Sequence, residues 1–227
     1  MVSRREKENA LTICKISTER GRGRPRKGEE HDGEALIGAA LACFAENGFD
    51  KTTLRTIAAR ARVDVALLSY RFGSKLGLWT AVLDAMAEDT LQRLDDWTST
   101  KEGLTTEMQL QRLCSNMVTM VTERPLFAQL LISEIMTGAD EERQSLIEAR
   151  MVHPIHHRLV DYTAKLRNLT SEDALAKLAL SLMASMSMIG VLVSTRHFLS
   201  RLAPLAEDDE AFRARLTSLM HHILTQP

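Results

Sequence analysis

Apolar residues in this chain repeat every three or four positions, and this spacing constrains the fold more than any other feature. Leu36, Ala40, Leu41 and Phe44 follow it, and the pattern continues almost to the C-terminal end. Such spacing lines one face of an α-helix, whereas a half-buried strand alternates every second residue. No long stretch alternates with period two, and only 4% of the residues are aromatic. We therefore predict an all-α fold.

Capping signals divide this pattern into separate helices. Asn47-Gly48 indicates the end of the first helix, Thr52 is a suitable N-cap for the second, and Asp64 is one for the third. Pro154 lies inside one of the longest predicted helical segments and predicts a kink or a break. A fourth helix runs from Ser74 towards Trp97, and further helices are expected over residues 105–122, 125–137, 141–168, 171–199 and 207–225.

Positive charge is concentrated in the first part of the chain, although the formal net charge is only -1. Counted as far as Leu78, the chain holds 15 Lys and Arg against 10 Asp and Glu, and the remainder holds 14 against 20. Because local charge attracts a polyanion, this asymmetry favours an anion-binding front and a body with another task. Residues 1–33 mix charges with Gly and Pro and lack an apolar period, so we expect a flexible basic arm.

Residues 34–80 hold three short helices in a helix-turn-helix order, in which the second helix of the pair enters the major groove of DNA. In VALLSYRF, 3–4 spacing places Val65, Leu68, Ser69 and Phe72 on a packing face. The other face collects Ala66, Leu67, Tyr70 and Arg71. Apolar Ala66 and Leu67 suit a thymine methyl group, Arg71 suits guanine, and Tyr70 suits a phosphate.

Residues 35–84 resemble the DNA-binding domain of the TetR family of bacterial transcriptional regulators. The resemblance rests on the FAENGFDKTT junction, the IAARARV helix and the YRFGSK exit. It implies that Leu68 and Phe72 are structural. It also implies phosphate or base contacts from Thr53, Arg55, Val65, Ala66, Leu67, Ser69, Tyr70, Arg71 and Lys75.

Two positions depart from the family pattern. Arg62 occupies a turn position that is usually Gly, and a left-handed backbone there costs about 1 kcal/mol relative to Gly. Either a contact from Arg62 to a phosphate offsets that cost, or the turn has a different shape. Ser69 stands where many members have an aromatic residue.

The arm contains a second motif, Arg22-Gly23-Arg24-Pro25. It resembles the core of an AT-hook, an extended segment that places arginine in the narrow minor groove. Two readings stay open for Arg22 and Arg24. They either enter the minor groove beside the major-groove helix, or they contact phosphates loosely and add salt-sensitive affinity.

The uncharged run from Leu178 to Thr195 is a candidate dimer seam, because its small residues permit close approach and its larger ones interlock. The TetR resemblance implies the same, since such proteins pair their last two long helices into a four-helix bundle. The alternatives are a helix buried within one subunit and a membrane helix. The predicted interface residues are Leu182, Ser185, Met186, Ile189, Gly190 and Val193.

The helical body between these parts is rich in Met. The resemblance implies a pocket there for a small effector, and these residues favour a largely apolar one; the alternative is that they form an ordinary core. The candidate pocket residues are Met86, Trp97, Met117, Met120, Phe127 and Met151.

Catalytic and metal-binding signals are weak. Cys14, Cys43 and Cys114 are far apart and form no CxxC pair, which favours a reduced cytoplasm over a disulfide framework or a zinc site. Pro154 disturbs the one His-rich segment, residues 153–157, and the chain has no GxSxG motif. The first twenty residues do not form a secretory signal pattern. We expect no metal, no cofactor and no enzymatic activity.

These observations predict three parts: a basic arm over residues 1–33, a helix-turn-helix domain over 34–80, and a helical effector-binding and dimerisation domain over 81–227. The expected function is that of a cytoplasmic, homodimeric regulator that binds a pseudo-palindromic operator in double-stranded DNA. Repression relieved by an apolar effector is the leading hypothesis. The alternatives are a ligand-independent or partner-controlled regulator, a DNA-architectural protein and a helical membrane-associated protein.

Overall fold

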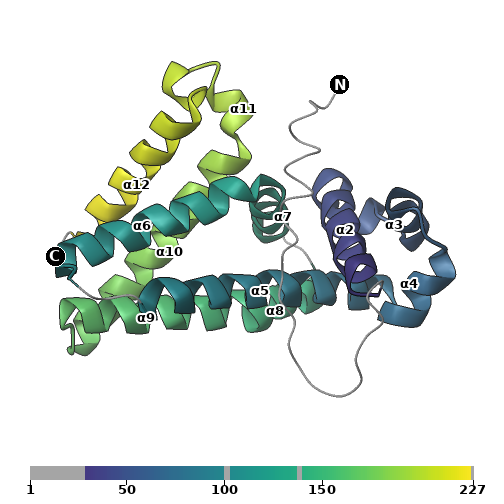
Figure 1. Ribbon diagram of the computed structural model, residues 1–227, viewed down its shortest axis with the longest axis horizontal. Helices are drawn as coiled ribbons and strands as arrows, with labels where there is room; N and C mark the ends of the chain where they lie inside the picture. Colours follow the sequence, from purple (N-terminus) through teal and green to yellow (C-terminus); the bar gives the residue numbers. More distant parts are fainter. Residues whose placement is uncertain (1–28, 100–102, 137–139, 226–227) are drawn as a thin grey trace. The chain divides into compact units, whose positions relative to one another are not determined.

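A computed structural model of the protein describes residues 29–99, 103–136 and 140–225, and in these ranges every regular element is helical (Figure 1). This confirms the predicted all-α class. The predicted contacts of Arg22 and Arg24 lie outside the described residues. The elements are α2 (Glu29–Lys51), α3 (Leu54–Ala61), α4 (Val65–Phe72), α5 (Lys75–Ser99), α6 (Thr106–Glu123), α7 (Pro125–Met136), α8 (Glu141–Ile147), the π-helical turn η1 (Glu148–Val152), α9 (His153–Arg167), α10 (Glu172–Ser194), α11 (Arg196–Leu199), the 3-10 turn η2 (Pro204–Ala206) and α12 (Asp209–Thr225).

The chain forms two compact units, Met1–Asp89 and Thr90–Pro227. The boundary falls inside α5, beyond the predicted boundary at residue 80, so this one helix contributes residues to both units. Helix α2 begins at Glu29, within the stretch assigned to the arm. Its first turn precedes Leu36, the first buried apolar residue of the helix, so apolar spacing does not reveal it.

The first unit is built from α2, α3, α4 and the beginning of α5. An aromatic cluster lies at its centre, where the ring of Phe44 meets Trp79 edge-on with centroids 5.2 Å apart and stacks on Phe49 at 5.6 Å. Phe44 and Trp79 are fully buried. Such aromatic pairs add about 0.5–1.5 kcal/mol each beyond the area that they bury. The cluster therefore fixes the end of α2 against the beginning of α5.

The break at the end of α2 follows the predicted Asn47-Gly48 signal. Gly48 has φ 75° and ψ 167°, a conformation that glycine adopts readily. The predicted role of Thr52 differs, because its buried hydroxyl donates to the carbonyl oxygens of Cys43 at 3.0 Å and Gly48 at 2.7 Å. Thr53 is the N-cap of α3 instead, and its hydroxyl accepts from the amide of Thr56 at 3.1 Å.

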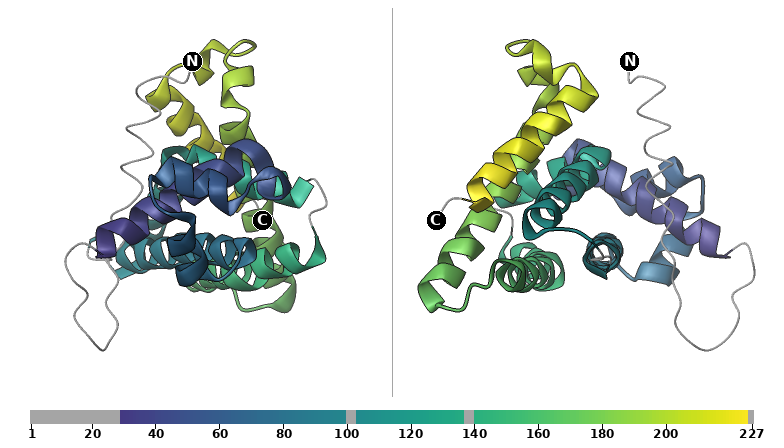
Figure 2. Two further views of the ribbon diagram at one scale, coloured as in Figure 1. Left: turned by 90° about the vertical axis from the view of Figure 1, so that its right-hand side faces the viewer. Right: turned by 60° about the vertical axis from the view of Figure 1, so that its left-hand side comes forward.

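The second unit is a helical bundle around α10. Helix α10 packs against α6, α7, α9 and α12, and α12 lies beside α6 (Figures 1 and 2). A buried ion pair joins α7 to α8, with Arg143 Nε donating to Glu134 Oε2 at 3.0 Å. Burial of a charged pair is tolerated when the geometry is this direct.

The structure accommodates Pro154 by a change of helix type and not by the predicted break, because Ile147, Val152 and His153 all keep right-handed helical backbone angles. The segment expected as one helix over residues 141–168 divides into α8, the π turn η1 and α9, and Pro154 lies in the first turn of α9. A proline has no N–H group, and its ring clashes with the carbonyl four residues earlier in a regular α-helix. The wider π turn directly before it removes that conflict.

Helix α10 is apolar on both sides, and the structure corrects the face predicted as the dimer seam. Leu182, Ser185, Ile189, Gly190 and Val193 are buried inside the subunit, and Met186 is half-buried, so this face is not available to a second chain. The opposite face exposes Leu180 at 71% and Val191 at 40%. A 3–4 repeat of apolar residues shows that a face is buried but not what covers it, and α10 carries two such faces.

Among the described helices, α10 is the one long and apolar enough to cross a membrane by length and composition alone. Its buried face packs against four neighbouring helices. A core helix of a helical bundle needs the same composition.

Candidate nucleic-acid interface and ligand cavity

The turn between α3 and α4 has the left-handed backbone anticipated for Arg62. This residue has φ 58° and ψ 43°, and its N–H donates to the carbonyl oxygens of Ala58 and Ala59 at the end of α3. Asp64 then caps α4, and its Oδ1 accepts from the amide of Ala66 at 2.7 Å. The turn is therefore short and bonded at both ends, which fixes the direction in which α4 leaves it.

Helix α4 is attached to the first unit through a narrow apolar edge. Leu68 is fully buried and Phe72 is half-buried, as expected for structural residues. Val65 and Ser69, which the helical wheel assigned to the packing face, are exposed, and Ser69 Oγ donates to the carbonyl of Val65 at 3.2 Å. Six of the predicted contact residues thus form one exposed surface, called here the α4 face: Val65, Ala66, Leu67, Ser69, Tyr70 and Arg71.

Tyr70 is the most exposed residue of the α4 face, with 90% of its surface accessible. A large aromatic residue with so much accessible surface adds little to the packing of the unit. It is available to a partner instead. The next residue, Arg71, reaches back to Gly33 in α2. Its Nη2 atom lies 3.1 Å from the position that a Cβ atom on Gly33 would occupy, so the side chain extends along the beginning of α2.

The remaining predicted contacts flank the α4 face. Thr53 and Arg55 are exposed at the beginning of α3, although the Thr53 hydroxyl also lies 2.8 Å from the hydroxyl of Thr56. Lys75 differs, because its Nζ donates to the carbonyl of Phe49 at 2.9 Å and lies 4.3 Å above the Phe49 ring. A cation at the carbonyl end of a helix is stabilised by the helix dipole and, here, by the ring. Lys75 therefore serves the fold of the first unit.

The region around the α4 face is strongly cationic. Residues 53–75 contain Arg55, Arg60, Arg62, Arg71 and Lys75, with Asp64 as the single acidic residue. Arg60 is paired with Glu46 of α2 through two contacts of 2.5 Å and 2.8 Å between the guanidinium and the carboxylate. This exposed pair, which sequence reasoning did not identify, raises the pKa of Arg60 and joins α3 to α2. The remaining positive charge suits a phosphate backbone.

A cavity of about 180 Å³ lies in the second unit. Its walls come from α6, α7, η1, α9 and α10, with Thr90 from the α5 segment of this unit. Apolar side chains form most of the lining, and the predicted pocket residues Met120, Phe127 and Met151 are among them. Leu182, Met186 and Gly190, predicted for the dimer seam, also line this cavity, which is called here the α10 cavity.

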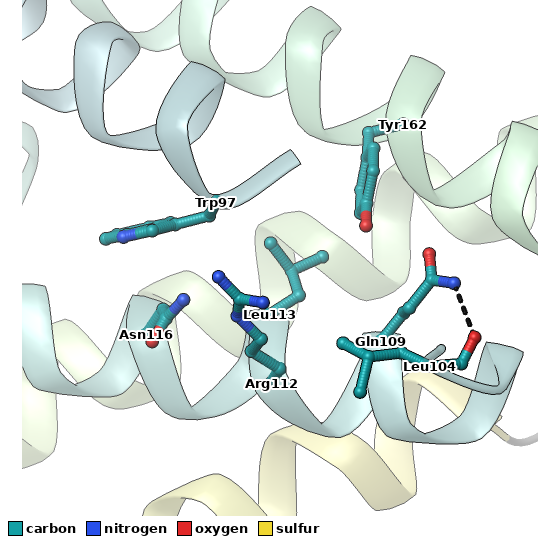
Figure 3. Close-up of a pocket in the computed structure, with 7 residues that line it drawn as sticks. All are labelled: Trp97, Leu104, Gln109, Arg112, Leu113, Asn116 and Tyr162. Carbon is teal, nitrogen blue, oxygen red and sulfur yellow. Dashed lines mark hydrogen bonds between the residues drawn. The ribbon is translucent and has the colours of Figure 1, made fainter. Parts of the chain in front are cut away.

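The other three predicted pocket residues lie elsewhere. Met86 is buried in the first unit, and Met117 is fully buried without lining the α10 cavity. Trp97 lines a different hollow, together with Arg112 and Tyr162 (Figure 3). That hollow measures about 10 Å³, which is the space of a single water molecule. The corrected candidate pocket therefore consists of the α10 cavity alone.

Sequence reasoning also missed several residues of the cavity, above all Arg124 and His156. Arg124 is 4% exposed and lies between α6 and α7. His156 is half-buried, and its Nε2 lies 3.0 Å from the carbonyl oxygen of Ala179. Polar residues inside apolar helical segments were the available signal, but spacing alone does not say which of them face a cavity.

Residues 36–82 match the family model described as bacterial regulatory proteins, tetR family. The chain thus carries a domain of this family over these residues. It is 28% identical over 144 residues to the HTH-type transcriptional dual regulator CecR of Shigella flexneri. That alignment covers 59% of this chain and 63% of CecR, so the chain spans less than two thirds of this curated relative.

Solved structures of TetR-like proteins share the fold of this chain. A TetR-like transcriptional regulator from Rhodococcus sp. RHA1 matches with a TM-score of 0.65 and 20% identity, covering 89% of this chain and 96% of the other. The fatty acid degradation regulator FadR from Bacillus halodurans matches with a TM-score of 0.62 and 14% identity, covering 91% of this chain and all of that one. At these identities the likeness establishes the fold.

The left-handed turn generates a prediction with an internal control. Replacing Arg62→Gly relieves the backbone and is expected to raise the free energy of unfolding by about 1 kcal/mol. The same replacement also removes a charge beside the α4 face, so it should weaken binding to DNA. Asn168 is the second left-handed residue, at the C-cap of α9 in the other unit. Asn168→Gly should stabilise the protein by a smaller amount and leave DNA affinity unchanged.

Thermal unfolding and fluorescence anisotropy with duplex DNA measure the two effects separately. If Arg62→Gly stabilised the chain but left DNA affinity and its salt dependence unchanged, Arg62 would have no role in phosphate contact.

Proposed function

We propose that this TetR-family protein is a dimeric transcriptional regulator that binds a pseudo-palindromic operator through the α4 face. In this proposal it is a repressor that occludes a promoter, and a small effector in the α10 cavity releases it. The observation that carries the proposal is the α4 face itself. Six side chains of varied chemistry are exposed on a short helix whose entry is bonded at both ends of a tight turn.

The chemistry of the α4 face fits direct readout in the major groove. Ala66 and Leu67 offer apolar surface to thymine methyl groups, and Arg71 has the paired donors that guanine accepts. Thr53, Arg55 and Arg62 are exposed on the neighbouring turn and helix, where they suit phosphate contacts that fix the register of the helix. Base readout and phosphate positioning thus come from adjacent parts of one unit.

The cavity supports control by a ligand. A ligand changes DNA affinity only if it binds one conformation of the regulator better than another. The lining residue Thr90 belongs to α5, and the same helix contributes the buried Leu78, Trp79 and Val82 to the first unit. A change in this helix is therefore a physical means by which occupancy of the cavity alters the DNA-binding unit.

A dimer is needed to read two half-sites of a pseudo-palindrome. The exposed apolar face of α10, with Leu180 and Val191, is the surface that we propose for pairing. It replaces the buried face predicted from the sequence. The basic arm adds Arg22 and Arg24 to the proposal, either in the minor groove or on phosphates.

Loss of the exposed side chains should reduce DNA binding without unfolding the protein. Arg71→Ala is expected to cost about 1–3 kcal/mol of binding free energy and to relax the base preference at one position of each half-site. Tyr70→Ala should weaken binding to all sequences, because a phosphate contact carries no base information. Arg201→Ala, an exposed arginine of the other unit, is the matched control. Selection of sites from random duplexes, followed by anisotropy titration, measures both effects, and equal affinity in all three variants would contradict the proposal.

The assignment of the dimer surface predicts the mass of two variants. Leu180→Glu combined with Val191→Glu places two charges on the exposed α10 face and should yield a folded monomer at micromolar concentration. Met136→Glu on α7 alters a residue that is 76% exposed and should leave the dimer intact. Light scattering gives the mass and circular dichroism gives the fold. A dimeric double variant would place the interface elsewhere.

The arm predicts a change in salt dependence. Each phosphate neutralised on B-form DNA contributes a slope of about 0.9 to the fall of log K with log salt. Replacing Arg22→Ala and Arg24→Ala together should therefore flatten that slope by about 2 and weaken binding. An unchanged slope and affinity would remove the arm from the DNA interface.

A further inference from the structure

We propose that the effector of the α10 cavity is a small amphipathic carboxylate, whose apolar body fills the cavity and whose carboxylate binds the guanidinium of Arg124. This inference rests on the proposed role of the cavity as the effector site. It replaces the expectation of a purely apolar ligand with a defined chemical class.

The position of Arg124 is fixed by the backbone around it. Arg124 is the C-cap of α6, with φ -126° and ψ 55°, and its N–H donates to the carbonyl of Val121. Its own carbonyl accepts from the amides of Phe127 and Ala128 at 3.0 Å and 3.1 Å, in the first turn of α7. The residue is thus held between two helices at the cavity wall, with 4% of its surface exposed.

Arg124 is the one permanently charged residue among the described residues of the lining, and no Asp or Glu occurs among them. Burial lowers the pKa of its guanidinium. A guanidinium carries five N–H donors in a planar fork, so it can bind a carboxylate through two of them in addition to a protein partner. An anion delivered with an apolar body would complement both the charge and the surrounding surface.

The other polar groups of the lining do not offer a fixed charge. His156 Nε2 lies 3.0 Å from the Ala179 carbonyl oxygen, within hydrogen-bonding distance. Thr90 is buried and Ser187 is exposed, and each offers a neutral hydroxyl. Arg124 is therefore the group that distinguishes an anionic ligand from a neutral one of the same shape.

The size of the cavity limits the body of the ligand. An apolar cavity of roughly 150 Å³ binds benzene, so 180 Å³ suits an apolar body of about six to eight carbon atoms. Octanoate is thus a suitable probe. Octanol and octylamine have the same chain with a neutral and a cationic head.

The test on the unaltered protein compares these three probes by isothermal titration. We expect octanoate to bind about 10- to 100-fold more tightly than octanol, as a charge-assisted hydrogen bond in a buried site provides, and octylamine to bind worst. Equal affinity for octanoate and octanol would overturn the inference, and so would binding of none of the three. This comparison does not depend on whether any variant folds.

Two arginine variants locate the contact. Arg124→Met keeps an unbranched apolar stem and should lower octanoate affinity about 10- to 100-fold while leaving octanol affinity unchanged or higher. Arg124→Lys retains the charge but lacks the planar fork of donors, so its octanoate affinity should lie between those of the unaltered protein and Arg124→Met. Arg112→Met is the matched control, because Arg112 lines the separate 10 Å³ hollow. If Arg124→Met kept the preference for octanoate, the carboxylate would bind elsewhere.

A third variant tests the cavity itself. Gly190 lines the cavity, and a Cβ atom built on it would lie 3.3 Å from Ile132 Cδ1. Gly190→Leu would therefore place a side chain in the cavity. It should weaken octanoate and octanol equally. Unchanged affinity for both would show that they bind outside the cavity.

Operator binding measured in parallel separates this inference from the proposed function. If octanoate bound through Arg124 without releasing the operator, that result would support the carboxylate site and contradict its role as the effector site. If the protein bound its operator but did not prefer octanoate to octanol, the proposed regulatory function would be unaffected and the carboxylate class of the ligand would be wrong.

Discussion

The burial of Leu68 is the constraint on which the α4 face, the proposed DNA-binding surface, depends. Helix α4 has only eight residues, too few to be stable alone in water, and Leu68 is its one fully buried side chain. The capped turn at Arg62 and Asp64 sets the direction of the helix, and Leu68 fixes its rotation. With both fixed, the remaining side chains must point outward. The α4 face is thus a consequence of how little of this helix the protein buries.

In the second unit, too, the share of a helix surface that is apolar determines what the helix can contact. Helix α10 is apolar around most of its circumference, so it can both cover a cavity with Leu182 and Gly190 and expose Leu180 and Val191. One helix can then serve the interior of the subunit and a surface for a second chain. The π turn before Pro154 adds Met151 and Val152 to the cavity wall, so a local irregularity required by one proline also shapes the site.

Sequence reasoning succeeded where a residue type has one physical meaning. Asp64 was a suitable N-cap and caps α4, and Arg62 has the left-handed backbone that its place at a turn Gly position raised as a possibility. Pro154 changes the type of its helix without breaking it. Sequence reasoning failed to predict which helix or which subunit covers a buried apolar residue, because several partners would give the same spacing. The apolar residues of α10 were buried as their spacing implied, but against the subunit's own helices, and Met86 and Met117 packed into solid core.

Long-range contacts were equally out of reach. The pairing of Glu46 with Arg60 and of Lys75 with the end of α2 depends on how helices cross, which spacing along the chain does not determine. The burial of Arg124 beside a cavity is a property of several segments at once. The family resemblance pointed to positions that prove to be exposed on α4, because it carries information on tertiary contacts that periodicity lacks.

The central claim is that the α4 face reads base edges in the major groove, and methylation interference on a selected operator tests it most directly. Methylation of guanine N7 marks the major groove, and methylation of adenine N3 marks the minor groove. The account predicts that N7 methylation blocks binding in two symmetric half-sites whose centres lie about one helical turn, or a multiple of it, apart. Interference confined to adenine N3, or absent at every guanine N7, would contradict it.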